Sequence, residues 1–545
     1  MRRILALFVA LALVLVSGSA AVAAPDANSV DRTLTAYAKD TWRSMVAMTD
    51  PRTGLVADNI TGDLSTRSTY TSPTNIGGYM WSAVVARELG FISRKEARDR
   101  ISKTLDTLGR LDHHKASGMF YNWYDPRDGS VVHVWPDDGS TVYPFLSSVD
   151  NGWLAASLRV VKGAVPELRG KADNILSKMN FGFYYSPAAS TPFGASGLIA
   201  GGFWDAAPPN CSQQRDGVWF TCNHYDITVT EPRIATYLGI GAGQIPAEAY
   251  FHTMRTLPAT CDWNWHEMQP VGFDTTYQDV PVYEGAYQYR GIQFVPSWGG
   301  DMFEALMPDL FVPEERWAPN SWGRNHRATV AGQIEHGLND AGYGYWGFSP
   351  ASNPNGGYTA WGVDAMGMDT DGYPSDMEFS KYDAGFGDCR PAGPAPDYGN
   401  GVVTPHAAFL ALPYAKGPVV DNLAKLKANF DSYGRGGFYD ATGAIRDVIQ
   451  NHLFQVLSNL AMEPPARMDS ESLRDEKVKV LKSIPALEAG DVVRGQFRGY
   501  RQERGVAADS QVETYAAIRL RINSSRWQGV PFYIRDELMR SRIAA

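Results

Sequence analysis

The feature that most constrains this chain of 545 residues is a series of amphipathic helical segments joined by long loops rich in Gly, Pro and aromatic residues. In residues 71–92, TSPTNIGGYMWSAVVARELGFI, apolar side chains recur at helical spacing until Gly90 ends the run. Further helices are expected after Asp150 and near Glu231. Paired helices joined by elaborate loops predict a toroid of helical hairpins, in which the loops at one end build the functional site.

A different pattern begins after Tyr433. The aromatic, Gly-rich loops give way to a denser charged helix and then to a segment that is partly strand. Residues 512–523, VETYAAIRLRIN, alternate apolar and polar side chains, which predicts a half-buried strand. Residues 443–461 carry an apolar stripe made of Ile445, Val448, Ile449, Leu453, Val456 and Leu460. The two patterns meet near residues 434–443 without the Pro- or Ser-rich linker that often separates domains.

Residues 1–24 have the three parts of a secretory signal peptide. Arg2 and Arg3 supply the positive flank, an apolar run follows, and small residues near 21–24 offer a cleavage site. A retained membrane anchor is the weaker alternative, because the apolar run is short for a span and no charged stop follows it. We therefore expect a secreted or extracytoplasmic protein that has no membrane attachment after cleavage.

Composition narrows the choice of partners. The formal net charge of −9 argues against nucleic acid or an anionic membrane as the main partner. Aromatic residues make up 12% of the chain, which suits sugar binding, because the flat apolar faces of sugars stack on aromatic rings. An aromatic core is the structural alternative.

The four cysteines predict disulfides, because an exported chain with an even count favours pairing. Cys211 and Cys222 bracket one loop and are the best candidates for a pair, whereas the sequence leaves the full connectivity open. No CxxC or HExxH spacing is present, so no metal site is expected.

Seven segments follow one another in an order that is typical of one known family. They are TSPTNIGGYMWSAVVARELGFI (71–92), SSVDNGWLAASL (147–158), TEPRIATYLGIG (230–241), PSWGGDMFEALMPDL (296–310), WGFSPASNPNGGYTAWGV (346–363), GVVTPHAAFLALPYA (401–415) and GGFYDA (436–441). This series resembles the bacterial glucoamylase-like family of (α/α)6 glycosidases, which includes β-1,2-glucan hydrolases. The resemblance covers most of residues 30–440. It implies a mainly α toroid that hydrolyses a polysaccharide or oligosaccharide, with no cofactor.

Glycoside hydrolysis requires one carboxylic acid to protonate the leaving oxygen and a second carboxylate to activate water or attack the sugar. The catalytic candidates are Glu231, Asp150, Glu304, Glu284 and Asp301, which lie near helix starts or beside tryptophans. The resemblance places Glu231 at an acidic position that lines the family's cleft, whereas Asp301 replaces a small residue that is usual there.

Each candidate also has a structural alternative. Asp150 suits the N-cap of a helix, and Glu231 suits an ion pair with Arg233. Glu304 lies in an apolar helix, so it is either buried and paired or turned toward the cleft.

Several aromatic and amide side chains are candidates for sugar contact, and about half of the tryptophans are expected to be ordinary core. The candidates for substrate binding are Trp153, Trp204, Tyr225, Trp298, Trp346, Asn355 and Tyr358.

The tail contains GRGGFYDATGAIRDVIQNHLFQVLSNLAMEPP (434–465), LRDEKVKVL (473–481) and a run from 495 to 535. These segments resemble the carboxy-terminal domain of glucose-6-phosphate dehydrogenase. The resemblance implies that Asp447 corresponds to a contact with the sugar phosphate and His452 to the acceptor of the hydroxyl proton. The chain has no strand–GxGxxG–helix unit to hold a nicotinamide cofactor, so we expect these two residues to be vestigial. We also expect the strands that follow the helix to be poorly packed, without their usual neighbours in the sheet and at a dimer interface.

The sequence thus predicts a mainly α fold with three parts: a signal peptide (1–24), an (α/α)6 domain (30–440) and a smaller α+β fragment (434–545). The predicted function is that of an exported glycoside hydrolase acting on a glucan or related polysaccharide. The alternatives are an NADP-dependent dehydrogenase-like protein, expected to be inactive, and a non-catalytic carbohydrate-binding protein. Convergence of two of the candidate acids would favour hydrolysis over binding.

Overall fold

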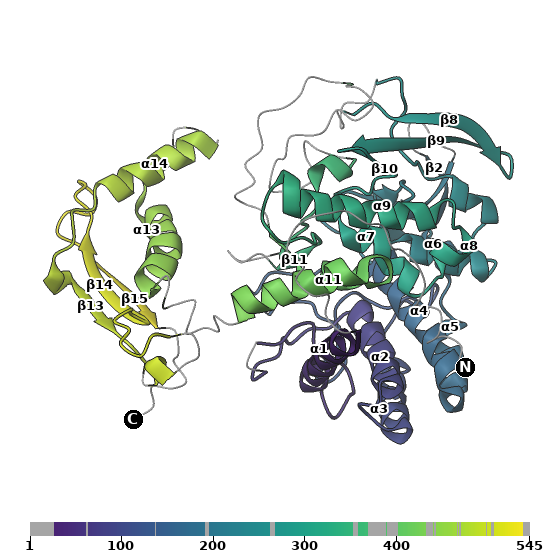
Figure 1. The fold of residues 1–545 in the computed structure, drawn as a ribbon, viewed down its shortest axis with the longest axis horizontal. Coiled ribbons are helices and arrows are strands. Elements are labelled where there is room, and N and C mark those ends of the chain that lie inside the picture. The colour runs from purple at the N-terminus through teal and green to yellow at the C-terminus, as the bar shows by residue number, and fades with distance from the viewer. Residues whose placement is uncertain are drawn as a thin grey trace. The chain divides into compact units, whose positions relative to one another are not determined.

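A computed structural model of the chain describes residues 27–61, 64–136, 138–190, 196–261, 268–352, 358–368, 389, 402–431, 440, 443–465, 467, 470–497, 499–502 and 506–537. The chain forms two compact units, residues 1–416 and 417–545, which are considered separately (Figure 1). The division precedes residues 434–443, where the sequence pattern changes. The signal-peptide segment 1–24 and most of residues 434–443 lie outside the described residues.

The larger unit is built mainly from helices, as the sequence predicts. They are α1 (Ala27–Met48), α2 (Pro73–Glu88), α3 (Arg94–Leu108), α4 (Ser148–Ala164), α5 (Arg169–Leu176), α6 (Arg233–Gly241), α7 (Met302–Leu306), α8 (Glu314–Trp317), α9 (Trp322–Glu335) and α10 (Pro405–Leu410), and α11 (Leu412–Leu426) crosses the division. Figure 1 shows α2, α3, α4 and α5 in the purple and blue part of the chain.

Helix α4 packs closely against α2 and against α6. A Cβ added to Gly77 of α2 would lie 3.1 Å from the Cα of Leu154 in α4, and one added to Gly152 of α4 would lie 3.1 Å from Ile234 in α6. The missing side chains therefore let neighbouring helices approach each other closely. Serine N-caps start two of these helices: Ser72 caps α2 and Ser147 caps α4.

Small antiparallel sheets form in the loops between these helices. Their strand orders are β1-β4-β6-β5, β2-β3-β7, β10-β9-β8 and β11-β12. The strands are β1 (Phe145–Ser147), β2 (Tyr185–Ser190), β3 (Ser196–Ala200), β4 (Gly202–Trp204), β5 (Ser212–Arg215), β6 (Val218–Thr221), β7 (His224–Tyr225), β8 (Val271–Tyr277), β9 (Val280–Tyr289), β10 (Ile292–Phe294), β11 (Ala351–Ser352) and β12 (Tyr358–Thr359). Because they decorate the loops and the helices supply most of the core, the mainly α prediction is confirmed.

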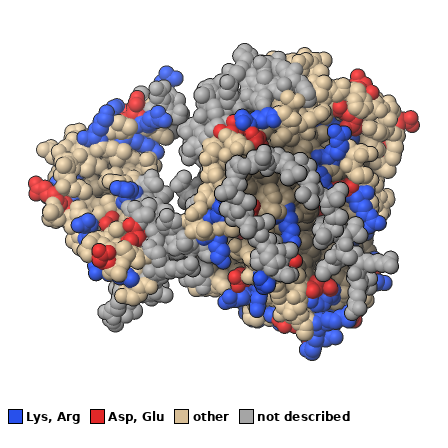
Figure 2. Space-filling model, in the orientation of Figure 1, with Lys and Arg blue, Asp and Glu red and all other residues tan. Residues whose placement is uncertain are grey.

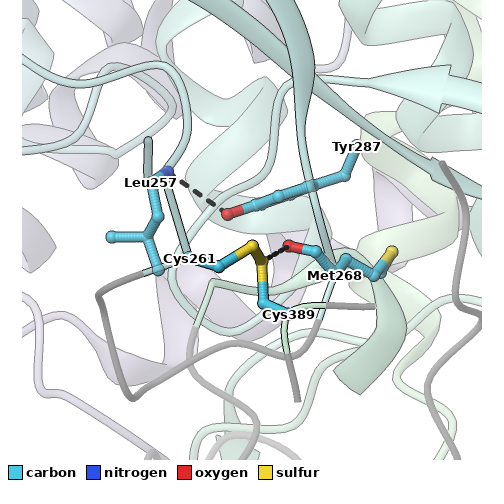
Figure 3. The surroundings of a disulfide bond; sticks show 5 residues. All are labelled: Leu257, Cys261, Met268, Tyr287 and Cys389. Carbon is cyan, nitrogen blue, oxygen red and sulfur yellow. Dashed lines mark hydrogen bonds between the residues drawn. A yellow bond between two sulfur atoms is a disulfide. The ribbon is translucent and has the colours of Figure 1, made fainter. Parts of the chain in front are cut away.

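Two disulfides tie loops of this unit together. Cys211 and Cys222 flank the β5–β6 hairpin and are joined, which confirms the predicted pair. The other bond joins Cys261 to Cys389, 128 residues further along the chain (Figure 3). Close to Cys261, the backbone N–H of Leu257 donates a 3.2 Å hydrogen bond to the hydroxyl of Tyr287 in β9. The hydrogen bond attaches the Cys261 loop to β9, and the disulfide links the same loop to Cys389.

The surface of the larger unit carries both signs of charge. Figure 2 shows Lys and Arg interspersed with Asp and Glu over the face in view. None of the described helices is long and apolar enough to cross a bilayer.

The smaller unit has an α+β core of its own. A π-helical segment, η9 (Ile445–Leu453), runs into α13 (Phe454–Ala461), and α14 (Ser470–Lys482) follows. The sheet has the order β13 (Val492–Gly495), β14 (Tyr515–Arg521) and β15 (Pro531–Glu537). As the alternating sequence predicts, β14 buries Ala516, Ile518 and Leu520.

Two expectations for the tail need correction. We expected the strands to be poorly packed without their usual neighbours, whereas the β14 side chains join Ile449 and Leu457 in one buried cluster. We also placed Val456 and Leu460 on the apolar stripe, and both are mostly exposed. The cause of the second error is local: the π-helical turn of η9 changes the angle between successive side chains, so a strict helical period fails there.

A pair of leucines tests whether this small core stabilises the tail. Leu457 is 3% exposed and Leu460 is 63% exposed on the same helix. We expect Leu457→Ala to lower the free energy of unfolding of this unit by about 2–5 kcal/mol, because it leaves a cavity in the core. Leu460→Ala should change it by less than about 0.5 kcal/mol. Urea unfolding of the full chain, followed by hydrogen exchange of β14 amides, measures both; equal effects would contradict the described packing.

Candidate active site

Four of the five predicted catalytic acids are brought together at the amino-terminal ends of three helices. Asp150 is in the first turn of α4, Glu231 lies two residues before α6, and Asp301 and Glu304 belong to the start of α7. The negative charges of Glu304 and Asp150 raise the pKa of Glu231, and the charge of Glu231 raises the pKa of Asp301. We call Asp150, Glu231, Asp301 and Glu304 the acid cluster.

Glu231 holds its proton most clearly. Burial raises the pKa of its carboxyl to about 8, and the charges of Glu304 and Asp150 add to the shift. The approach of the Trp153 indole and the charge of Arg233 lower the pKa, but they do not outweigh burial. Glu231 Oε2 and Trp153 Nε1 are both buried and make no hydrogen bond of good geometry among the described residues. The indole N–H of Trp153 therefore lies near the carboxyl of Glu231 without satisfying it fully, and the carboxyl keeps unused hydrogen-bonding capacity.

Asp301 and Glu304 form a coupled pair. Asp301 is the N-cap of α7, where its Oδ1 accepts a 2.8 Å hydrogen bond from the backbone N–H of Glu304. Glu304 Oε2 accepts a 3.0 Å bond from the backbone N–H of Trp298. Burial raises the pKa of both carboxyls, and the neighbouring charge of Glu304 raises that of Asp301 further. Burial therefore disfavours ionisation of both carboxyls, and their proximity opposes the simultaneous ionisation of the two.

The carboxylate of Asp150 accepts hydrogen bonds from several side chains. Its Oδ1 accepts a 2.7 Å hydrogen bond from Thr74 Oγ1. Burial raises its pKa, while hydrogen bonds from Thr74, Ser147 and Ser72 act in the opposite direction. The alternative that Asp150 is only an N-cap is wrong, because Ser147 takes that position and accepts the 3.1 Å bond from the Asp150 amide. Its side chain is thus left free of the capping role.

The sequence did not identify Asp58, an acid that lies near the acid cluster. Asp58 lies close enough to Asp150 for the charge of Asp150 to raise its pKa, in addition to the larger effect of burial. It stands in a loop far from Asp150 in sequence, without helical or strand periodicity around it. No signal in the local sequence distinguishes it from any other loop aspartate.

Arg233 fixes the segment that carries Glu231. Its guanidinium donates to the carbonyl oxygens of Thr230 (2.8 Å), Glu304 (2.6 Å) and Ala305 (2.8 Å). It also forms a two-pronged ion pair with Glu314, at 2.7 and 2.9 Å. The expected structural alternative, an Arg233–Glu231 ion pair, is therefore replaced by a pair with Glu314, and Glu231 is not neutralised by direct contact.

Glu314 also belongs to a compact group with Asp309 and His326, whose ligand atoms lie within 4.8 Å of one another. Burial raises the pKa of Glu314, but the charge and hydrogen bonds of Arg233 outweigh it and hold the pKa at about 2. His326 Nε2 lies 3.1 Å from Glu314 Oε2. Because Arg233 occupies both oxygens of Glu314, a cation at this place would compete with the guanidinium, and we assign the group a structural role.

Glu284, the fifth candidate, has a different neighbourhood. It lies on β9 and pairs with Arg255 at 3.3 Å. No member of the acid cluster has its pKa shifted by Glu284. The structure thus separates Glu284 from the four acids that interact.

The predicted sugar contacts divide by exposure. Trp346 is 1% exposed, and Trp153 and Trp204 are also buried, so these rings belong to the core in this conformation. Trp298 and Tyr225 are half-buried. As a whole residue, Tyr358 is 72% exposed. Partial burial of its hydroxyl raises its pKa to about 12, and the charges of Glu231 and Asp301 contribute smaller shifts in the same direction. Tyr358 therefore stands beside the acid cluster, whereas Asn355 lies outside the described residues.

The dehydrogenase-like residues of the tail are placed only by their backbone. Asp447 and His452 both lie in η9. Their side chains lie outside the described residues.

The acid cluster predicts a pH-dependent stability that Glu231→Gln should remove. The pKa of Glu231 is about 8 when folded, against an ordinary value of 4.5, so the folded state binds this proton more tightly than the unfolded state. Stability is therefore lost as the pH rises from about 4.5 to about 8, and the loss is complete above that range. The variant should gain stability relative to the wild type across this range in urea titrations. The exposed Glu248→Gln is the control, and a pH-independent difference for Glu231→Gln would contradict the shift.

Each of the two parts of the chain is similar to known proteins. Residues 420–539 match the family described as glucose-6-phosphate dehydrogenase, C-terminal domain, and residues 36–183 match one described as a protein of unknown function (DUF3131). Glucose-6-phosphate 1-dehydrogenase of Caenorhabditis elegans is 42% identical over 139 residues, which are 23% of this chain and 27% of that protein. The enzyme of Ceratitis capitata is 49% identical over 124 residues, 21% and 24% of the two chains. This chain spans about a quarter of the length of these relatives.

Solved structures resemble the larger unit. The β-1,2-glucanase from Parabacteroides distasonis is 16% identical, with a TM-score of 0.50 over 74% of this chain and 51% of its own. The endo-β-1,2-glucanase from Chitinophaga pinensis is 15% identical, with a TM-score of 0.49 over 74% and 83% of the two chains. Identities this low show a shared fold alone. The chain thus combines a glucoamylase-like toroidal fold with a carboxy-terminal segment similar to that of glucose-6-phosphate dehydrogenase.

Proposed function

We propose that the protein is an exported glycoside hydrolase that acts on a glucan, with Glu231 as the general acid. The observation that carries this proposal is the placement of four interacting carboxyls at the amino-terminal ends of α4, α6 and α7, where burial and the neighbouring charges raise the pKa of Glu231 to about 8. At neutral pH the Glu231 carboxyl holds a proton, which is the state that a general acid needs before the glycosidic bond breaks. A second carboxylate of the acid cluster, in its ionised form, then stabilises the positive charge that develops on the sugar ring.

Asp150 is the best candidate for the second carboxylate. Its hydrogen bond from Thr74 and its position in the first turn of α4 both stabilise a negative charge. In the reaction, Glu231 gives its proton to the glycosidic oxygen as the C–O bond breaks, and Asp150 activates the water or attacks the anomeric carbon. The exposed ring of Tyr358 stands where a sugar could stack beside these acids.

The substrate class follows from similarity. The solved structures of similar fold are named as β-1,2-glucanases, so a linear β-1,2-glucan is the first substrate to test, within a panel of α- and β-glucans. Export rests on the signal-peptide pattern of residues 1–24. The pairing of all four cysteines is consistent with an oxidising compartment, where disulfides persist.

Replacing the proposed acid tests the chemistry directly. Glu231→Gln keeps the shape of the side chain and removes its proton, so turnover of the glucan should fall about 10²–10⁴-fold. Binding of the sugar should change little. Product chromatography gives the turnover, and calorimetry with a short oligosaccharide gives the affinity. Glu248→Gln, on the exposed surface, should hydrolyse at the wild-type rate.

Two other outcomes of this experiment have distinct meanings. Near-full activity of Glu231→Gln would remove this residue from the mechanism. Binding of sugar without hydrolysis by the wild type would instead favour a non-catalytic carbohydrate-binding protein.

The tail motivates a second candidate function, because it is 42–49% identical to parts of glucose-6-phosphate dehydrogenases. The chain covers only about a quarter of those enzymes and has no strand–GxGxxG–helix unit to bring a nicotinamide ring to the sugar. A residue that accepts a proton does not oxidise a sugar unless a hydride acceptor is also bound. We therefore propose that the tail has no dehydrogenase activity.

The purified chain, mixed with glucose 6-phosphate and NADP, should show no increase in the absorbance of reduced cofactor. A glucose-6-phosphate dehydrogenase added to the same mixture is the positive control. A rate in the chain alone that disappears in His452→Ala would overturn this prediction.

A further inference from the structure

A cavity of about 530 Å³ lies outside the acid cluster. It is formed by the β8–β9 hairpin, the short helix η3 (Ala247–Phe251) and the start of α9. None of the four carboxyls of the acid cluster lines it. It contains Glu284, the candidate acid that the cluster leaves out.

Aromatic rings form the apolar part of this cavity. Phe251 and Tyr277 are stacked, with ring centroids 4.9 Å apart and an interplanar angle of 22°. Tyr277 is 37% exposed and Phe273 is 63% exposed. Large aromatic rings left in contact with water at a cavity wall are suited to a ligand that has flat apolar faces.

The polar part is built around a fixed ion pair. The buried Arg255 donates to the carbonyl oxygen of Thr253 (2.7 Å), to Thr228 Oγ1 (3.1 Å) and to Glu284 Oε1 (3.3 Å). The side chain of Glu284 is partly exposed and makes no other side-chain hydrogen bond among the described residues. Its second oxygen can therefore accept hydrogen bonds from a ligand, while Arg255 holds the carboxylate in place.

The balance of these groups selects the ligand. Arg255 and Glu284 cancel each other's charge, and the exposed Arg324 adds a further hydrogen-bond donor and one positive charge to the lining. Exposed amides of Gln293 and Asn320 add donors and acceptors at the rim. A ligand with many hydroxyls and flat apolar faces matches such a lining, and a neutral sugar has both.

We propose that this cavity is a second glycan-binding site, which holds a neutral glucan chain away from the acid cluster and takes no part in bond cleavage. This inference rests on the proposed function for its choice of glucan. The site raises the local concentration of polymer near the acids, as linked binding sites do. It therefore affects long substrates and has no influence on oligosaccharides too short to reach it.

The test measures how far the full chain is retarded in native gels that contain soluble β-1,2-glucan, relative to a gel without sugar. All variants carry Glu231→Gln, so that binding is measured without hydrolysis of the polymer. Addition of Tyr277→Ala, Phe273→Ala or Glu284→Gln should raise the dissociation constant for the polymer about tenfold, as expected for loss of one good stacking or hydrogen-bonding contact. Tyr533→Ala, which removes an exposed tyrosine from β15 of the smaller unit, is the matched control and should migrate like the background.

A kinetic measurement in the chain with Glu231 intact separates this site from the acid cluster. Tyr277→Ala should raise KM for the polymer and leave kcat for a short oligosaccharide unchanged. The gel result stands even where no hydrolysis is found, so failure of the proposed function and failure of this inference are distinguishable. Equal retardation of the Tyr277→Ala, Phe273→Ala and Tyr533→Ala variants would overturn the inference, as would the absence of retardation in the Glu231→Gln background.

Discussion

The ion pair between Arg233 and Glu314 is the interaction on which the rest of the site depends. The guanidinium joins the amino-terminal end of α6 to α8 through Glu314. It joins the same end to α7 through the carbonyl oxygens of Glu304 and Ala305. Its other face lies 4.4 Å from the ring centroid of Trp322, which lines the cavity proposed for glycan binding. One buried cation thus fixes both the turn that carries Glu231 and a wall of the second cavity. Because a buried ion pair that loses one partner leaves an uncompensated charge, neither Arg233 nor Glu314 can be replaced singly without a large cost.

The same pairing explains how Glu231 keeps its proton. If Arg233 were bonded to Glu231, the carboxylate would be ionised and its pKa would be low, as it is for Glu314. Glu314 instead takes the guanidinium, so Glu231 is left in a buried site where two further carboxylates oppose its ionisation. The choice of partner for one arginine therefore separates a structural acid, always charged, from an acid that can donate a proton.

The sequence predicted the elements of this arrangement better than their connections. Apolar periodicity predicted α2 and α4, and the sequence placed Asp150 at a helix start, whereas Glu304, which was placed inside an apolar helix, lies in the first turn of α7. The partner of Arg233 was not predictable, since Glu314 is 81 residues away and only the packing of α6 against α8 brings them together. Glu284 was misplaced for the same reason: it lies near Trp298 in sequence, but the β8–β9 hairpin carries it to Arg255.

The tail shows how a segment can keep its structure without the site of the proteins that it resembles. Ile449 and Leu457 pack against the buried face of β14, so the helix and sheet stabilise each other within residues 417–545. All the residues of this core lie within the smaller unit, so the segment needs no apolar partner from residues 1–416 to form it. Dehydrogenation needs in addition a bound nicotinamide cofactor, which a separate nucleotide-binding unit holds. A stable core in the tail is therefore no argument for dehydrogenase activity, and the structure of the segment and the chemistry of its relatives are separate questions.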